Sequence, residues 1–291
     1  MAKLFGFVQF DFAGTLPLTD GRYLAGSAEN AEETVLVLQR IGAPPIGERR
    51  RRRGRSTRAE VEPAPLALTR ATVVRAAAPF EGQADAARWL DQACEAEEAV
   101  DGLAAEAVAT LNRALHAQAV AAADPYGREL SPEGAERVLL GYGSGEEVAD
   151  GHFTDARQVG LGPRAASRRR SREEELRPQE RVAAVLRGRE QLDACETLLL
   201  RARTDLDAGR GREAALQLRV GLEALLAELA GAVDDPGHAK DIAALRERQR
   251  EVEGAAKQAV AGKLAGEQRA QVGELLETCE RVVRRRRVLR G

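Results

Sequence analysis

The sequence predicts an α+β protein that is predominantly helical, with a small N-terminal antiparallel β module, central helices and a C-terminal antiparallel four-helix bundle. Apolar residues alternate or run together over 1–80, recur every three or four positions from 83, and repeat every seven from about 182. The expected parts are a β module at 1–80 with a basic loop at 48–62, a helical region at 81–156 with a Gly-rich loop at 141–155, an Arg-rich linker at 157–173, and the bundle at 174–291.

The β module begins with a strand over 3–13. Its apolar positions Leu4, Val8, Phe10 and Phe12 share one face, and Gln9 and Asp11 lie on the other. The turn signal Thr19-Asp20-Gly21-Arg22 follows, and 22–25 is long enough for a short returning strand. The β-branched run at 34–41 and the run at 66–76 complete a sheet of three to five strands.

The central region changes to a helical period at Gln83 and keeps it to about Ala123. Ser131 and Pro132 have the features of a helix start, as an N-cap followed by proline at the first helical position. That short helix is expected to end at Gly141, where a loop begins.

The C-terminal region has the clearest periodicity. A heptad-like helix runs through 182–206, with Val185, Leu192, Leu199 and Leu206 seven residues apart and Val182, Cys195 and Ala202 as companions. Short loops between long helices favour antiparallel neighbours. Four helices are therefore expected, at 174–208, 212–231, 238–262 and 267–288.

Composition excludes few functions but disfavours some. The net charge is -2, the pI about 6.1 and the aromatic content 3%, so neither a global basic field nor many base-stacking platforms are present. The three cysteines are far apart, which disfavours a disulfide framework or a zinc site and suits a reducing cytoplasmic compartment. No apolar run approaches the ~20 residues that span a bilayer, so no membrane span is expected.

Two loops contain candidate site residues. The run Gly141-Tyr142-Gly143-Ser144-Gly145 invites a phosphate-loop interpretation, but the segment before it is expected to be helical and two glutamates follow it. A structural loop is therefore favoured. The densest cluster of possible metal-binding or acid–base groups comes next in the chain, and its members are Glu147, Asp150, His152 and Asp155.

Arginine forms three clusters, at 49–53, 168–172 and 284–287. The guanidinium group of arginine can donate two parallel hydrogen bonds to phosphate oxygens. The first cluster is therefore a candidate for phosphate or nucleic-acid contact through Arg49, Arg50, Arg51, Arg52 and Arg53. The acidic pI and the lack of interleaved aromatics favour exposed loop charge instead. The last cluster also suits the C-terminus of a helix electrostatically.

Residues 201–230 (RARTDLDAGRGREAALQLRVGLEALLAELA) resemble the helix–turn–helix core of HEPN-type bundles, and equally a single tetratricopeptide hairpin. The resemblance implies helical pairing. The Arg-x4–6-His motif of RNase-active HEPN proteins is missing around His238, which argues against nuclease activity.

The favoured hypothesis is a non-enzymatic protein–protein interaction, scaffold or assembly protein that binds a protein partner or itself through its helices, without a cofactor or a metal. The alternative is a nucleic-acid-binding accessory protein that uses its Arg-rich loops. A third possibility is an enzyme that uses Glu147, Asp150 and His152 in one cleft.

Overall fold

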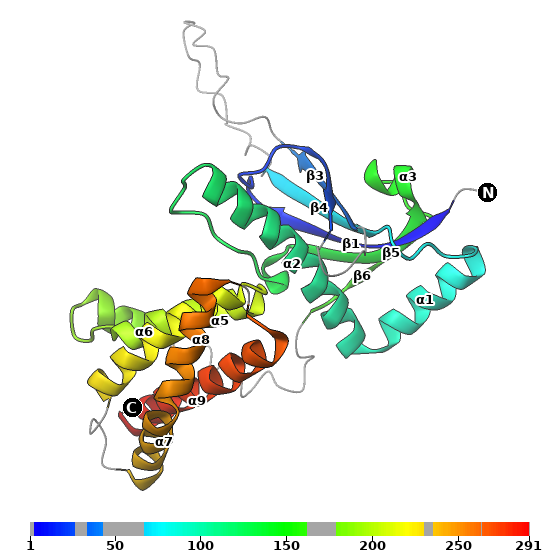
Figure 1. Ribbon diagram of the computed structural model, residues 1–291. Helices are drawn as coiled ribbons and strands as arrows, with labels where there is room; N and C mark the ends of the chain where they lie inside the picture. The colour runs from blue at the N-terminus through cyan, green and yellow to red at the C-terminus, as the bar shows by residue number, and fades with distance from the viewer. Residues whose placement is uncertain are drawn as a thin grey trace, which may run out of the picture. The chain divides into compact units, whose positions relative to one another are not determined.

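The computed structural model describes residues 3–26, 34–42, 67–161, 179–229, 235–262 and 264–290. The chain divides into two compact units, an N-terminal unit at Met1–Arg164 and a C-terminal unit at Ala165–Gly291, and each is described by itself. The predicted class is confirmed: the protein is α+β and predominantly helical, with one antiparallel sheet in the N-terminal unit (Figure 1).

The sheet of the N-terminal unit has the strand order β2-β3-β4-β1-β5-β6, and each neighbouring pair is antiparallel. The first four strands lie where the alternation of apolar residues predicts them. Strand β1, with seven consecutive buried residues, takes a central place because it is apolar on much of both faces. The strands are β1 Leu4–Ala13, β2 Gly21–Ala25, β3 Thr34–Ile41, β4 Leu68–Arg75, β5 Arg137–Ser144 and β6 Asp155–Val159.

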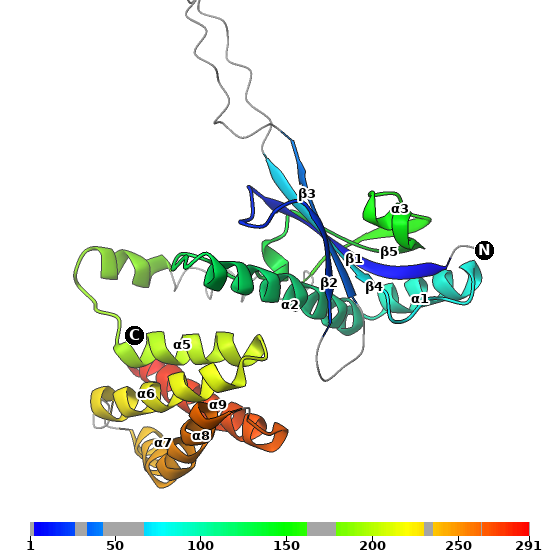
Figure 2. The same cartoon turned by 45° about the horizontal axis from the view of Figure 1, so that its top comes forward.

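Helices α1 (Gln83–Glu95) and α2 (Glu97–Ala121) cover one face of the sheet, and the short helix α3 (Gly145–Ala149) lies on the other (Figures 1 and 2). The first face carries the even-numbered residues of β1, among them Phe10, which pack with Leu90 and Leu111. The sequence predicted this face of β1. On the second face, Phe7 and Val74 pack against Val148 of α3.

The prediction of a helix that starts at Ser131 and ends at Gly141 is wrong. A 3-10 turn covers Pro132–Gly134, and Arg137–Ser144 is strand β5 between β1 and β6. Residues 137–140 are too few to separate a helical period from a strand buried on both faces, so the helix-start signal misled the prediction. Residues 81–156 therefore contribute a central strand to the N-terminal sheet in addition to helices.

The described helices of the C-terminal unit between 194 and 290 enclose one apolar core. Its largest fully buried side chains are leucines, such as Leu218, Leu222 and Leu225 on α6. Helices α5 and α6 form an antiparallel hairpin, in which Gly221 lies against Leu199. The helices are α5 Ala194–Asp207, α6 Gly211–Leu229, α7 Pro236–Glu247, α8 Gln249–Ala261 and α9 Gly266–Arg290.

Two of the four expected helices are interrupted. The expected helix at 174–208 is helical at 179–186 and again in α5, but 187–193 is not helical, and Gly188 has a φ of +68°. Its heptad repeat is thus buried only in the second part, at Cys195, Leu199 and Ala202. The expected helix at 238–262 is divided at Arg248 into α7 and α8.

Candidate functional site

The structure does not bring the predicted acidic cluster together as a metal site. No group of three possible metal ligands is found among the described residues. Glu147 and His152 are exposed, and Glu147 accepts a hydrogen bond of 2.6 Å from the Ser144 hydroxyl. Asp150 ends α3 and forms an exposed ion pair of 2.9 Å with Arg22 of β2, and Asp155 begins β6.

The glycine run of 141–145 serves close packing, not phosphate binding in a loop. A Cβ atom on Gly141 would lie 2.4 Å from the carbonyl oxygen of Asp155, and one on Gly143 would lie 2.8 Å from Val148 Cγ2. These glycines let β6 and α3 approach β5 more closely than any side chain allows. The run is therefore a strand and a helix start, which corrects the loop prediction.

The arginine clusters differ in what the structure shows of them. Arg49–Arg53 and Arg168–Arg172 lie outside the described residues. In the third cluster, Arg285 Nη1 lies 2.8 Å from Asp241 Oδ2, and Arg286 forms an ion pair with Asp193. This cluster thus joins α9 to α7 and to the start of α5.

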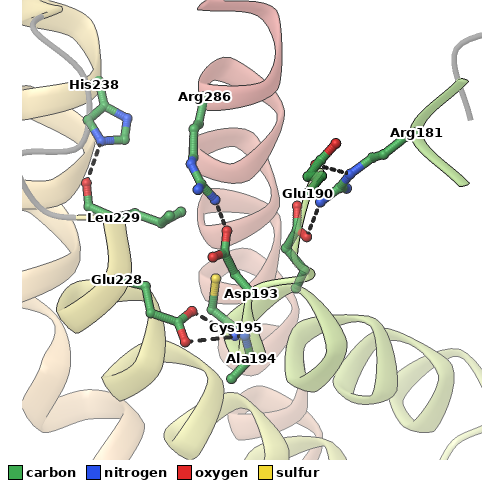
Figure 3. A network of polar contacts seen from close by, with 10 residues as sticks. Arg181, Glu190, Asp193, Ala194, Cys195, Glu228, Leu229, His238 and Arg286 are labelled. Carbon is green, nitrogen blue, oxygen red and sulfur yellow. Dashed lines mark hydrogen bonds and ion pairs between the residues drawn. The ribbon is translucent and has the colours of Figure 1, made fainter. Parts of the chain in front are cut away.

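A polar network surrounds the N-terminus of α5 (Figure 3). The cap residue Asp193 turns its carboxylate to Arg286 of α9 instead of capping its own helix. The Glu228 carboxylate of α6 takes over that role, since it accepts hydrogen bonds from the backbone N–H groups of Ala194 at 3.2 Å and Cys195 at 3.0 Å. The first N–H groups of a helix lack partners within it, so this carboxylate satisfies two of them from a neighbouring helix.

The two cysteines of the C-terminal unit are buried, and their thiols have raised pKa values. Burial first, and then the hydrogen bond and charge of Glu228, raise the pKa of the Cys195 thiol to about 12. Burial, followed by the charge of Glu280, raises the pKa of the Cys279 thiol to about 12. A nucleophilic cysteine requires a lowered pKa, so neither thiol is suited to catalysis.

His238 is buried in the same unit, where its Nε2 donates to the carbonyl oxygen of Leu229 at 3.0 Å (Figure 3). This bond fixes the tautomer, because a carbonyl oxygen can only accept. No partner is found for Nδ1 within the described residues. No acid–base partner for His238 is thus present in the described part of the chain.

The segment 179–193, which leads into α5, is held by charged residues. Arg181 donates to Glu190 at 2.6 Å and to Glu196 at 2.5 Å, and the Asp193–Arg286 pair fixes its other end (Figure 3). Its large apolar side chains, apart from the partly buried Val185, are exposed to solvent. Exposed fractions are 57% for Val182, 82% for Leu186 and 58% for Leu192, and Leu200 on α5 is 68% exposed.

A second polar feature crosses the sheet face that carries α3. Gln39, Arg70, Asp11 and Arg137 are direct partners in register on β3, β4, β1 and β5. We call this the polar row. Arg70 donates to Asp11 through Nε at 2.8 Å and Nη2 at 3.2 Å, and Arg137 does so through Nε at 3.0 Å and Nη2 at 2.7 Å.

Burial alone would raise the pKa of Asp11, but the hydrogen bonds and charges of Arg70 and Arg137 outweigh it and lower the pKa below its usual 3.8. Asp11 is therefore ionised at neutral pH. The sequence placed Gln9 and Asp11 on the face away from the main core, and this was the only signal for the polar row. Arg70 and Arg137 were missed, because single arginines in strands carry no motif.

Comparisons with known protein families, with characterised proteins and with solved structures find no match to this chain. Among the described helices, none has the length and apolar character needed to cross a membrane.

Proposed function

We propose that this is a non-enzymatic interaction or scaffold protein that associates through its C-terminal helical unit, and that a second copy of the chain covers its exposed apolar surface. The observation that supports this is the exposure of two large apolar side chains on the helical residues 179–186. Charged Arg181 faces inward, to Glu190 and Glu196, whereas Val182 and Leu186 face outward.

A surface helix normally buries its apolar stripe and exposes its charges. Val182 and Leu186 are four residues apart and therefore share one side of the helix. With Leu192 and Leu200 exposed nearby in the chain, the segment 179–200 carries four large apolar side chains in contact with water. Contiguous exposed apolar surface marks interaction sites in soluble proteins, and Val182 and Leu186 are neighbours on one helix. We call these four residues the apolar surface.

The self-complementary spacing of Val182 and Leu186 supports a second copy as the partner. In a two-fold antiparallel pair of helices, Val182 of one copy faces Leu186 of the other, since a two-fold interface repeats each contact.

The proposal is tested by size-exclusion chromatography with light scattering on the full chain. We expect a dimer that V182S/L186S converts to a monomer, whereas the matched variant L216S/V220S, on the outer side of α6, remains dimeric. A monomer at all concentrations would contradict the proposal.

A further inference from the structure

The polar row is the open end of the face that carries α3. The rows of this face change from apolar to polar along the strands: Phe7 pairs with Val74, then Gln9 with Thr72, then Asp11 with Arg70. Helix α3 packs on the apolar end through Val148. Ala149, the last residue of α3, accepts a hydrogen bond of 3.0 Å from Gln39 Nε2 of the row, and Gly151, which follows α3, lies beside Arg70 Nη1.

Both guanidinium groups of the polar row are fixed, yet each keeps donors for another partner. The bonds to Asp11 use the Nε and Nη2 atoms of Arg70 and of Arg137. No bond from either Nη1 is found among the described residues, and neither atom is buried without a partner, so both contact water. The Arg137 side chain is 40% exposed, whereas that of Asp11 is only 6% exposed.

The charge of the polar row selects the class of ligand. Two guanidinium groups and one ionised carboxylate leave a net charge of +1, because Gln39 is neutral. The nearby Arg22–Asp150 pair adds none. One further carboxylate would therefore neutralise the polar row, and arginine forks bind carboxylates through two parallel hydrogen bonds. Asp11 holds both forks in position, which lowers the entropy lost on binding.

We propose that the polar row binds a carboxylate of an acidic segment in a partner protein, with Arg137 as the main contact and Asp11 as the positioning residue. Nucleic acid is the less suitable ligand. The neighbouring positions on this face are Gln9 and Thr72, so no aromatic ring adjoins the row there to stack on a base. This proposal concerns the N-terminal unit and does not depend on self-association through the C-terminal unit.

The test uses the full chain and a short fluorescent oligoglutamate peptide, with oligoglutamine and a single-stranded oligonucleotide as comparison ligands. Anisotropy should show oligoglutamate binding that weakens as salt rises. R137Q should weaken it about tenfold or more, since a hydrogen bond to a charged group is lost. R137K keeps the charge but cannot donate two parallel hydrogen bonds, so its affinity for oligoglutamate should lie between those of the wild type and R137Q. R22Q/D150N, which removes the neutral Arg22–Asp150 pair on the same face outside the row, should bind like the wild type.

A second measurement uses the wild-type chain alone, so it does not depend on whether R137Q folds. The Nε–Hε resonances of Arg70 and Arg137 should shift on addition of oligoglutamate, because both guanidinium groups meet the ligand. Oligoglutamate binding that leaves these resonances unmoved would overturn the proposal and leave the polar row a purely structural contact. Preferential binding of the oligonucleotide at the row would also overturn it, in favour of a nucleic-acid ligand.

Discussion

The Glu228 carboxylate accepts a hydrogen bond of 3.0 Å from the backbone N–H of Cys195, so the end of one helix caps the start of another. Helices are usually capped by a side chain that directly precedes them. Here that residue, Asp193, pairs with Arg286 and contributes to the anchoring of the segment 179–193. The cap of α5 and the position of the apolar surface are therefore linked through Asp193.

Removal of the Glu228 carboxylate should destabilise the C-terminal unit. We expect E228A to lower the free energy of unfolding by about 1–2 kcal/mol, as loss of a helix cap does. E228Q should cost less, because its amide oxygen can still accept one bond. Urea unfolding followed by circular dichroism measures both. The control is E223A, which removes an exposed i,i+4 pair with Arg219 and should change stability by less than about 0.5 kcal/mol. Equal losses in E228A and E223A would contradict the capping role.

Gly141 should not tolerate a side chain. G141A places a Cβ atom 2.4 Å from the Asp155 carbonyl oxygen, so β6 must move away from β5. We expect a loss of about 1–3 kcal/mol in the stability of the N-terminal unit, as for other overpacked sites. G134A is the matched control, since nothing lies within 4 Å of its Cβ position. Thermal unfolding of the two variants compares them, and a G141A variant as stable as G134A would show that β6 does not approach β5 this closely.

The Asp11 ion pairs should stabilise the N-terminal unit in a pH-dependent way. The folded pKa of Asp11 lies below its usual 3.8, so its contribution is fully present above that value and is lost as the pH falls through the folded pKa. At pH 7, D11N should cost about 2–4 kcal/mol, somewhat less than a fully buried pair because Arg137 is partly exposed.

Urea unfolding of wild type and D11N at a series of pH values checks this prediction. The difference between them should narrow as the pH is lowered from 5 through the folded pKa. D150N, which breaks the exposed pair with Arg22, should cost at most about 1 kcal/mol at any pH. A difference between wild type and D11N that stays constant in acid would contradict the assigned role of Asp11.

The three cysteines should differ in reactivity. Cys195 and Cys279 are buried with pKa values of about 12, whereas Cys94 is only partly buried. Burial is also the main cause that raises the pKa of Cys94 above 9.0, so it should react slowly at pH 8 and faster as the pH rises. Ellman's reagent should therefore titrate one thiol in the folded chain and three after unfolding. Rapid reaction of all three in the folded chain would be inconsistent with the core described here.

The sequence was sufficient for the elements whose burial follows a simple period. Strands β1 to β4 lie within a few residues of their predicted ranges, because β-branched and aromatic runs bounded by turn residues identify strands. The leucine stripe of α6, which faces the core, identified that helix in the same way. Strand β5 was missed because the helix-start signal at Ser131 and Pro132 led to a helical interpretation of the short apolar run that follows.

The two polar sites could not be predicted from the sequence, because their contacts join residues that are far apart in the chain. The polar row joins Asp11 to Arg137 across 126 positions, and Glu228 caps a helix 33 positions earlier. Neither leaves a local pattern. The heptad at 182–206 was misleading for a related reason. The break near Gly188 interrupts the helix, and Val182 before it and Leu192 after it fit the period but are exposed.

The most direct test of the proposed self-association is hydrogen–deuterium exchange of the full chain at low and high protein concentration. We expect peptides covering 179–200 to gain protection as concentration rises, while peptides on the outer side of α6 around Leu216 and Val220 do not change. V182S/L186S should abolish that gain. Exchange in 179–200 that is independent of concentration, or protection that appears on α6 instead, would contradict self-association through the apolar surface.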